Sequence, residues 1–414
     1  MKLRFITVML LVPMLMFCLS CNKQEGGNNE QEQKQEQEQE EVNTDPFSEL
    51  LPPEVKDGDV VLTTNPNVEK FVTSVTYPEN NYTTTHILDA DYQPTAPGKD
   101  DIPSKYSIRW QPDPSIKVEN ITARLWEDIP GGWSQDFAYP DVNEEETKGQ
   151  KINYLIVYNM VPNLKYKYEV KAGDKVLASG SFTTTGHCRQ VYFSAVHNSR
   201  DLGGWKTKDG NKTVKYRKIY RGGRLNEGLL ARGKRDLLAE GIKAQLDLRG
   251  VDDVLSEDNC TLKNVGVEGW SFCAPVIEEG YIWMMRDDQE KTKQCMQFIM
   301  KCVKENKPVY FHCSLGRDRT GTVAMMVLGL LGVDEGEISK EYEITQFAPH
   351  GYSVCTGEKT KMTRKTDADY WRAATYIWDN WANDGSFADG MENYLLSLGI
   401  TKAEIDEFRS LMLE

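Results

Sequence analysis

The residues best suited to chemistry lie in one decapeptide, His312–Gly321, between the apolar run Val309–Phe311 and the helix-like run Val323–Leu331. A loop that joins a strand to a helix N-terminus directs successive backbone N–H groups inward, and this arrangement binds a phosphate-sized anion without a metal. Cys313 lies at the base of the loop. The helix dipole, the loop amides and Arg319 all favour its thiolate over its thiol, so we expect a nucleophile that is ready at neutral pH.

The decapeptide resembles the signature of the cysteine-dependent phosphatases, which is His-Cys, five residues, Arg, and then Ser or Thr. The resemblance implies that phosphate monoesters are hydrolysed through a cysteinyl-phosphate intermediate, with Cys313 as the nucleophile and Arg319 as a clamp on the phosphoryl oxygens. We expect His312 to order the loop and the Thr320 hydroxyl to hydrogen-bond the Cys313 sulfur. The predicted phosphate-binding residues are Ser314, Leu315, Gly316, Arg317, Asp318 and Arg319.

Two upstream stretches narrow the resemblance. Asn198–Gly204 and Arg221–Leu225 look like the Asn-x-Arg-Asp-x-Gly-Gly and Arg-x-Gly-x-Leu motifs of a bacterial and fungal branch of the tyrosine phosphatases. The likeness spans most of Arg189–Glu414, and that branch includes a secreted enzyme with tyrosine, serine/threonine and phosphoinositide phosphatase activity. Arg200 and Asp201 lie next to a Gly-Gly turn, and charge pairs in such places usually fix a loop, so we expect a structural role for both.

The sequence leaves open which residue is the general acid that protonates the leaving oxygen. Tyrosine phosphatases usually supply an Asp from a loop upstream of the signature, but Phe272–Glu279 contains none. Asp318, inside the phosphate loop, is the first choice, and Asp247, at the end of the strand Ile242–Leu248, is the second. Glu278 and Glu279 are the remaining candidates.

The substrate class is also open. Protein phosphotyrosine is the first expectation, with dual or lipid specificity as an extension of it. Arg317 would add a second positive charge at the mouth of the site, which would suit the alternative of a phosphoinositide or inositol phosphate and would also suit an acidic phosphopeptide. An insertion over 346–380, rich in Lys and Trp, is expected to form either a lid or a solvated loop followed by an amphipathic helix. A second alternative is a surface binding lipoprotein whose phosphatase-like domain only docks phosphate.

The first residues indicate export. Residues 1–20 carry two basic residues and then an apolar run that is short for a membrane-spanning helix, which is typical of a signal peptide. Leu19-Ser20-Cys21 resembles a bacterial lipoprotein cleavage box, so we expect Cys21 to be lipidated and the protein to be anchored in the cell envelope, in the outer membrane. Residues 21–56 form a Gln/Glu-rich segment that is expected to be a flexible linker.

The remaining chain divides into two predicted domains. Over 57–186, short alternating runs at roughly ten-residue spacing, among them Phe71–Val75, predict the strands of an all-β sandwich. Its closing hairpin resembles fibronectin type III and immunoglobulin-like domains. Trp126, Trp133 and Tyr139 would pack in it or line a glycan or protein site. Over 187–414, strands alternate with helices, which predicts an α/β domain with a central, mainly parallel sheet.

Charge and cysteine content complete the expectations. The net charge of −14 over 414 residues argues against binding to nucleic acid. Seven cysteines follow Cys21, an odd number that fits one free catalytic thiol. Cys273 lies in the loop expected to cover the site, so we predict a reversible disulfide between Cys273 and Cys313. No Cys/His cluster has metal-ligand spacing, so neither a metal nor another cofactor is expected.

Overall fold

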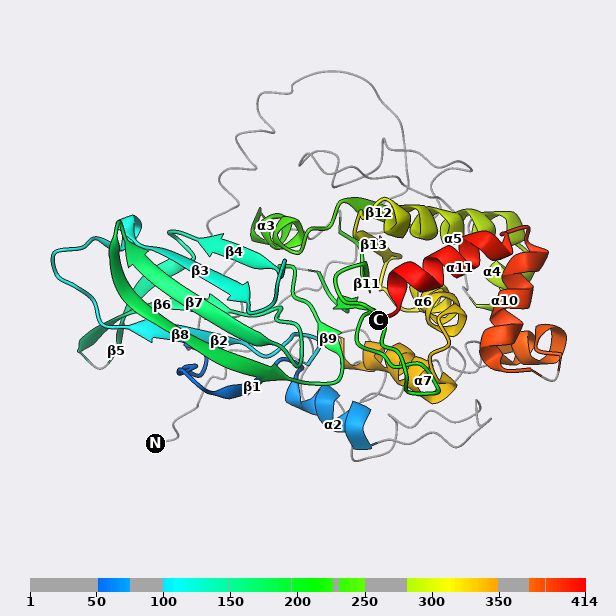
Figure 1. The fold of residues 1–414 in the computed structure, drawn as a ribbon, viewed down its shortest axis with the longest axis horizontal. Helices are drawn as coiled ribbons and strands as arrows, with labels where there is room; N and C mark the ends of the chain where they lie inside the picture. Colours follow the sequence, from blue (N-terminus) through cyan, green and yellow to red (C-terminus); the bar gives the residue numbers. More distant parts are fainter. Residues whose placement is uncertain are drawn as a thin grey trace, which may run out of the picture. The chain divides into compact units, whose positions relative to one another are not determined.

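A computed structural model of the protein describes residues 51–74, 100–147, 149–194, 196–225, 231–249, 281–348, 372–383 and 385–414. The predicted signal peptide, Cys21 and most of the predicted linker lie outside these residues, as do Cys273, Glu278 and Glu279. The described chain contains an N-terminal β region, residues 60–62 and 106–185, and a C-terminal α/β region, residues 189–414 (Figure 1).

The α/β region is built on a five-stranded sheet in the order β12-β13-β11-β10-β9. Its strands are β9 (Arg189–Gln190), β10 (Arg200–Asp201), β11 (Ile219–Gly222), β12 (Ala244–Asp247) and β13 (Val309–His312). β13 pairs in parallel with both β12 and β11, whereas β10 pairs antiparallel with β11 and β9. The sheet is therefore mixed, and the prediction of a mainly parallel sheet is wrong. The antiparallel strands β9 and β10 were not predicted, because each has only two residues and neither contains an apolar run.

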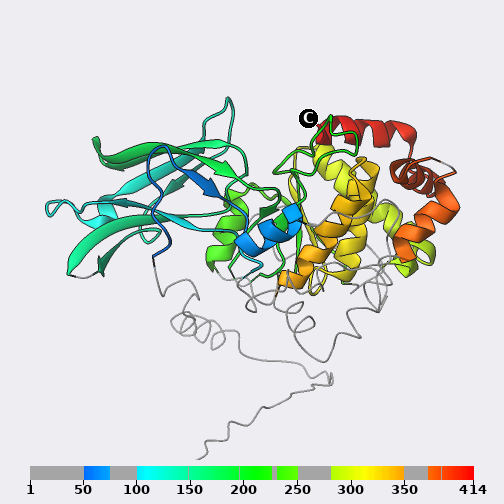
Figure 2. The same cartoon turned by 90° about the horizontal axis from the view of Figure 1, so that it is seen from below.

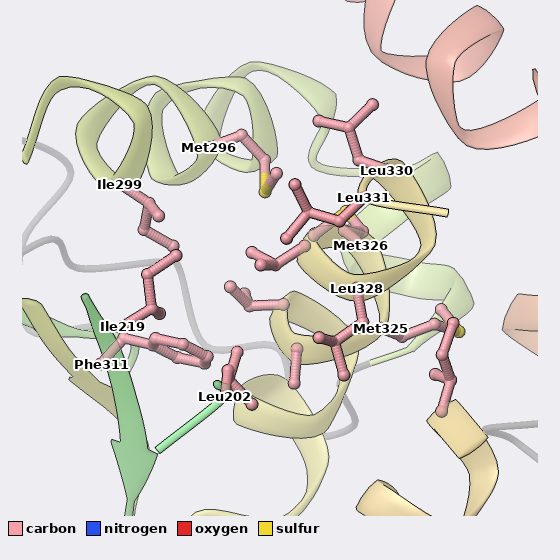
Figure 3. Packing of buried hydrophobic residues seen from close by; sticks show 14 of the residues in the cluster. Leu202, Ile219, Met296, Ile299, Phe311, Met325, Met326, Leu328, Leu330 and Leu331 are labelled. Carbon is pink, nitrogen blue, oxygen red and sulfur yellow. The ribbon is translucent and has the colours of Figure 1, made fainter. Parts of the chain in front are cut away.

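Helix α6 carries the centre of the hydrophobic core. The helices of this region are α3 (Ala231–Ala239), α4 (Ile282–Arg286), α5 (Gln289–Lys304), α6 (Asp318–Leu330), α7 (Glu335–Glu343), a helix over 372–381, α10 (Phe387–Ser397) and α11 (Lys402–Met412), and the short 3₁₀ helix is η5 (Ile344–Phe347). α6 is buried on every side from Thr320 to Leu330, as expected for a helix that is apolar all round. It contacts α5, α7, α10, β11 and β13, and Figure 3 shows Met296 of α5 facing the side chains of α6. This packing holds the N-terminus of α6 at the end of β13.

The N-terminal β region contains two sheets that share one hydrophobic core. Their strand orders are β1-β8-β7-β3-β4 and β2-β6-β5. The strands are β1 (Val60–Leu62), β2 (Tyr106–Trp110), β3 (Thr122–Glu127), β4 (Ser134–Phe137), β5 (Val142–Thr147), β6 (Gln150–Val157), β7 (Lys165–Ala172) and β8 (Lys175–Thr185), and a 3₁₀ turn, η3 (Val118–Asn120), precedes β3. Alternate residues of β6 and β7 are buried, as the period-2 pattern predicts.

One segment that was predicted as a strand is a helix. The run Phe71–Val75 was expected to be extended, but α2 (Pro66–Ser74) covers its described part. Asn65 caps the helix, because its Oδ1 accepts from the Asn67 backbone N at 2.9 Å, and Pro66 occupies the first helical turn, where its missing N–H costs nothing. The apolar residues of α2 have helical rather than strand spacing.

Helix α2 packs on the α/β region, although it lies in the chain between β1 and β2 of the β region. Phe71 contacts Phe347 at a ring-centroid distance of 5.8 Å, and the Lys340 Nζ donates to the Val72 carbonyl at 3.0 Å. Figure 2 shows α2 beside α7. The predicted domain 57–186 includes α2, whereas the buried face of α2 belongs to the core of the α/β region.

Buried charges join the two regions. Arg217 pairs with Glu127 of β3 at 2.9 Å and with Glu240, after α3, at 2.7 Å. The Trp133 Nε1 donates to the Ala239 carbonyl at 2.8 Å beneath the Arg217 guanidinium. Trp133 is thus part of this contact rather than of an exposed ligand surface.

Two further predicted surface aromatics differ from Trp133. Tyr139 is exposed, and Trp126 is half-buried.

Within the described ranges, no helix is both long and apolar enough to cross a membrane.

Candidate active site

The candidate site lies at the carboxyl end of β13. Cys313 directly follows this strand and is 3% exposed, and α6 begins five residues later at Asp318. The central position of β13 between two parallel neighbours places its end where ligands bind in open α/β sheets. The four residues between Cys313 and α6 form the turn that the signature predicts. We refer to residues 313–319 as the phosphate loop.

Gly316 allows the phosphate loop to lie directly on another backbone. It has a φ of 69°, in the left-handed region that favours glycine, and a Cβ there would collide with the backbone of Gly222. The Arg224 backbone N donates to the Ser314 carbonyl at 3.2 Å. The Gly222-Gly223 pair at the end of β11 therefore supplies the surface on which the loop rests.

Asn198 holds two loop carbonyls. Its Nδ2 donates to the Leu315 carbonyl at 3.1 Å and to the Gly316 carbonyl at 3.0 Å. Its own backbone is left-handed, with a φ of 60°, which Asn adopts more readily than most residues. A carbonyl that is bonded on the outer side of the loop turns the neighbouring N–H groups toward the inner side, where an anion binds.

Two buried arginines share one carboxylate behind the phosphate loop. Glu341 of α7 accepts from the Arg200 Nε at 2.6 Å and from the Arg221 Nη1 at 2.8 Å. Arg221 also donates to the Gly316 carbonyl, and Arg200 donates to the Asn198 Oδ1. Although burial disfavours the charged form, the two guanidinium groups hold the pKa of Glu341 below its ordinary value. The predicted structural role of Arg200 agrees with this geometry.

Asp201 also has a structural position. Its carboxylate accepts from the Arg189 Nη1 at 2.9 Å and from the backbone N atoms of Gly203 and Arg217, both at 2.8 Å. Burial raises the pKa of Asp201 despite these donors. The residue fixes the turn that leads from β10 toward β11.

His312 is fully buried behind Cys313. The Gln245 Nε2 donates to its Nε2 at 2.9 Å, and its Nδ1 faces the Cys313 carbonyl at 3.1 Å. An amide N–H only donates, so the ring accepts at Nε2 and carries its proton on Nδ1. Burial holds the pKa of His312 below its ordinary value. These contacts hold the ring at the end of β13, and its role in ordering the loop stays a prediction.

The two candidate acids have different surroundings. The Asp247 side chain is 3% exposed, and Arg249 holds both of its oxygens, with contacts of 2.6 to 3.0 Å. Although burial disfavours its ionisation, the neighbouring His312 and the Arg249 guanidinium hold the pKa of Asp247 below its ordinary value.

Asp318 is the accessible carboxylate of the pair. Its side chain is 35% exposed at the first position of α6, and its Oδ1 accepts from the Tyr281 hydroxyl at 2.5 Å. The Tyr281 hydroxyl also contacts the Tyr342 hydroxyl at 2.7 Å. Glu278 and Glu279 lie outside the described residues and are not compared with it.

The remaining loop residues have separate roles. The Arg319 Nη1 donates to the Leu248 carbonyl at 2.6 Å, which fixes one edge of its half-buried guanidinium group. The Arg317 side chain is only 4% exposed, whereas Leu315 is 44% exposed. The Thr320 hydroxyl is buried without a hydrogen-bond partner among the described residues, and its predicted bond to sulfur stays a prediction.

Some residues of the site were missed at the sequence level. Asn198 and Arg221 were quoted only as parts of motifs, without their contacts to the phosphate loop. Glu341 and Tyr281 carry no local signal, because each reaches the loop from an element distant in sequence. Among the described residues, no cluster of three or more His, Cys, Asp or Glu side chains could hold a metal.

Comparisons with known proteins agree with the signature. The model of the Tyrosine phosphatase family matches residues 191–414. A tyrosine-protein phosphatase from Nostoc commune is 28% identical over 213 residues, which cover 44% of this chain and 70% of that protein. The chain belongs to the tyrosine phosphatase family and is a phosphatase.

Two solved structures have partial likenesses. The core catalytic domain of the PP-IP phosphatase SIW14 from S. cerevisiae is 16% identical with a TM-score of 0.24, covering 37% of this chain and 88% of that chain. Tk-PTP in its active form is 17% identical with a TM-score of 0.23, covering 36% of this chain and 92% of that chain.

Proposed function

We propose that this protein hydrolyses phosphotyrosine in proteins through a cysteinyl-phosphate intermediate. The Cys313 thiolate attacks phosphorus while the bond from phosphorus to the leaving oxygen breaks, and Arg319 binds the equatorial oxygens. Asp318 donates its proton to the leaving oxygen. In the second step a water attacks the phosphocysteine, Asp318 takes a proton from that water, and the thiolate leaves with inorganic phosphate as the product.

Exposure favours Asp318 over Asp247 as the acid. A general acid must reach the leaving oxygen and must also exist in its protonated form. Asp318 is partly exposed at the edge of the phosphate loop, whereas both oxygens of Asp247 are occupied by Arg249. We assign Asp247 to an ion pair that supports the strand end.

The exposure of Leu315 supports an aryl phosphate as the substrate. Leu315 is the exposed side chain of the phosphate loop, and it is apolar, whereas the charged Arg317 is buried. An aromatic ring attached to the bound phosphate gains from apolar contact. Additional phosphate groups of an inositol phosphate would meet an uncharged side chain at this position.

The deciding experiment compares substrates and acids with purified protein. We expect a phosphotyrosine peptide to be turned over with at least a tenfold higher kcat/KM than inositol phosphates, and Cys313→Ser to abolish turnover. Asp318→Asn should remove the basic limb of the pH profile of kcat, and Asp247→Asn should retain it. The reverse result would assign the acid role to Asp247. A higher kcat/KM for inositol phosphates would instead support the alternative substrate.

The N-terminal segments have a proposed role in tethering. We propose that residues 1–20 are removed as a signal peptide, that Cys21 is lipidated in the outer membrane, and that the Gln/Glu-rich linker holds the enzyme away from the lipid. Metabolic labelling with a palmitate analogue tests this assignment. Labelling of the wild type but not of Cys21→Ser supports it, and equal labelling contradicts it.

We also propose that the β region is a fibronectin type III or immunoglobulin-like sandwich. Its strand orders β8-β7-β3-β4 and β2-β6-β5 match the G-F-C-C′ and B-E-D orders of that architecture. The Tyr166 hydroxyl, at the start of β7, accepts from the Val161 backbone N at 2.9 Å, which is the geometry of a tyrosine corner.

A further inference from the structure

One residue outside the span of the family match touches the support of the phosphate loop. Asp101 lies between α2 and β2, before residue 191, and it is 6% exposed. Its Oδ2 accepts from the Asn198 backbone N at 2.9 Å and faces the His197 Nδ1 at 3.2 Å. Since Asn198 holds the carbonyls of Leu315 and Gly316, Asp101 is one hydrogen bond away from the residue that shapes the loop.

The segment that carries Asp101 is itself fixed. The Asp100 carbonyl accepts from the Gln190 Nε2 at 3.0 Å, and the Asp100 Oδ1 accepts from the Asn67 Nδ2 at 3.0 Å. The Ser104 hydroxyl donates to the Thr64 carbonyl at 2.7 Å. These contacts tie the segment both to β9 and to the chain around α2, so the position of Asp101 is defined.

The carboxylate of Asp101 is costly where it lies. Its Oδ1 is buried and has no hydrogen-bond partner among the described residues. A buried oxygen without a partner costs free energy, and a negative charge close to an anion site also weakens binding of the anion. A buried residue that lowers the stability of the folded protein in this way is expected mainly at functional sites. In return, the Asp101 carboxylate is a charge-assisted acceptor for the backbone N–H of Asn198, whose backbone is left-handed.

We propose that Asp101 is a positioning residue for the phosphate loop and acts through Asn198. The catalytic unit of this phosphatase then includes residues 100–104 and α2 in addition to the span of the family match. The proposal rests on oxyanion binding by the phosphate loop. It does not depend on which carboxylate is the acid or on which phosphate ester is the substrate.

Removal of the Asp101 carboxylate has opposite consequences for charge and for positioning. If the charge alone mattered, Asp101→Ala would tighten binding of an oxyanion. If Asp101 positions Asn198, the same change weakens it. The readout is the Kd of tungstate, a phosphate analogue, measured by calorimetry on the full chain. We expect Asp101→Ala to raise this Kd about tenfold, and Asp136→Ala, on exposed β4, to leave it unchanged. A Kd within twofold of the wild type, or a lower Kd, overturns the proposal.

A double-mutant cycle tests whether Asp101 acts through Asn198. We expect Asp101→Ala to have no further effect on the Kd in an Asn198→Ala background, because the hydrogen bonds from the Asn198 side chain to the phosphate loop are already absent there. Additive effects overturn the proposal.

If Asp101→Ala shows no cooperative unfolding, Asp101→Asn replaces it in the cycle. Its neutral acceptor should raise the Kd about threefold in the wild-type background and not in Asn198→Ala. A threefold effect that persists in both backgrounds contradicts the assignment. Turnover of 4-nitrophenyl phosphate by the wild type is recorded separately, so that loss of the proposed catalytic function is distinguished from loss of positioning.

Discussion

The Tyr281 hydroxyl donates a hydrogen bond of 2.5 Å to Oδ1 of Asp318. Tyr281 is fixed on a second side, because its backbone N donates to the Thr322 Oγ1 at 2.8 Å. The Tyr342 hydroxyl, at 2.7 Å from that of Tyr281, extends the chain of buried hydroxyl groups to α7. The proposed acid is therefore held by one oxygen, and its other oxygen, Oδ2, can face a leaving group.

Tyr281→Phe should impair proton donation and leave phosphate binding intact. A leaving group of high pKa depends on the acid more strongly than a leaving group of low pKa. We expect kcat for phenyl phosphate to fall about tenfold, and kcat for 4-nitrophenyl phosphate to fall less than threefold. Steady-state kinetics with both esters measures this difference.

The matched control for this variant is Tyr394→Phe. The Tyr394 hydroxyl donates to the Met285 carbonyl at 2.6 Å in the same region but does not touch Asp318. It should change both rates equally, if at all. Equal losses with the two esters in Tyr281→Phe would show that Tyr281 supports the fold and not the acid.

Gly316→Ala should disable the phosphate loop. The new Cβ would collide with the Gly222 backbone, and the residue would keep a left-handed φ of 69°. Backbone strain of this kind costs about 1–3 kcal/mol, and the displacement of the loop should lower kcat/KM by about a hundredfold. Turnover of 4-nitrophenyl phosphate and urea unfolding measure the two effects.

Gly332→Ala separates strain from contact. Gly332 has a φ of 77°, but a Cβ there would meet nothing within 4 Å. It should lose about 1 kcal/mol of stability and keep its activity. If Gly332→Ala loses activity to the same degree as Gly316→Ala, the close approach to Gly222 is not what matters.

Much of the site could be predicted because its chemistry is local in sequence. Cys313 and Arg319 lie on one loop, and the order strand, loop, helix follows from apolar runs on either side. The support of the loop could not be predicted in the same way. Glu341 and Asp101 reach it from an amphipathic helix and from an interdomain segment, and only the tertiary fold brings these elements together.

The secondary structure predicted from the sequence was wrong at helix α2. Phe71 and Val72 are β-formers, so they suggested a strand, but the cap at Asn65 followed by Pro66 was the stronger local signal. The two-residue strands β9 and β10 could not be found from periodicity at all. Their pairing is set by the buried side chains of Arg189 and Asp201, which bond each other at 2.9 Å.

Glu341→Gln should destabilise the protein and weaken oxyanion binding. The carboxylate is 1% exposed and neutralises Arg200 and Arg221 together. Removal of one partner from a buried ion pair costs about 3–5 kcal/mol, because the remaining charge has no compensation. Urea unfolding and the Kd of tungstate measure both effects.

Glu337→Gln on the same helix is the comparison for Glu341. Its side chain is 35% exposed and pairs with Lys340, so a loss of about 0.5 kcal/mol or less is expected. Comparable losses in the two variants would mean that the buried network contributes no more than a surface pair.

Asp236→Asn should stabilise the contact between the two regions above neutral pH. Burial raises the pKa of Asp236, on α3, to about 7, against the partial effects of Arg232 and of the Tyr158 hydroxyl at 3.0 Å. Between pH 4 and 7 the folded protein therefore keeps a proton that the unfolded chain has lost. The contribution of Asp236 to the free energy of unfolding thus falls as pH rises through this window and is constant above it.

The amide variant removes this pH dependence. Asn has the shape of the protonated carboxyl and can still accept from Tyr158, so the two proteins should have equal stability near pH 4. At pH 8 the variant should be more stable by about 4 kcal/mol, because a shift of about three pKa units is worth about 1.4 kcal/mol per unit. Urea unfolding at unit pH steps measures the difference, with Asp136→Asn, whose side chain is 80% exposed, as the control. A constant difference between Asp236→Asn and wild type from pH 4 to pH 8 would show that Asp236 is ionised throughout. In that case the contact between the regions carries a buried charge instead of a neutral hydrogen bond.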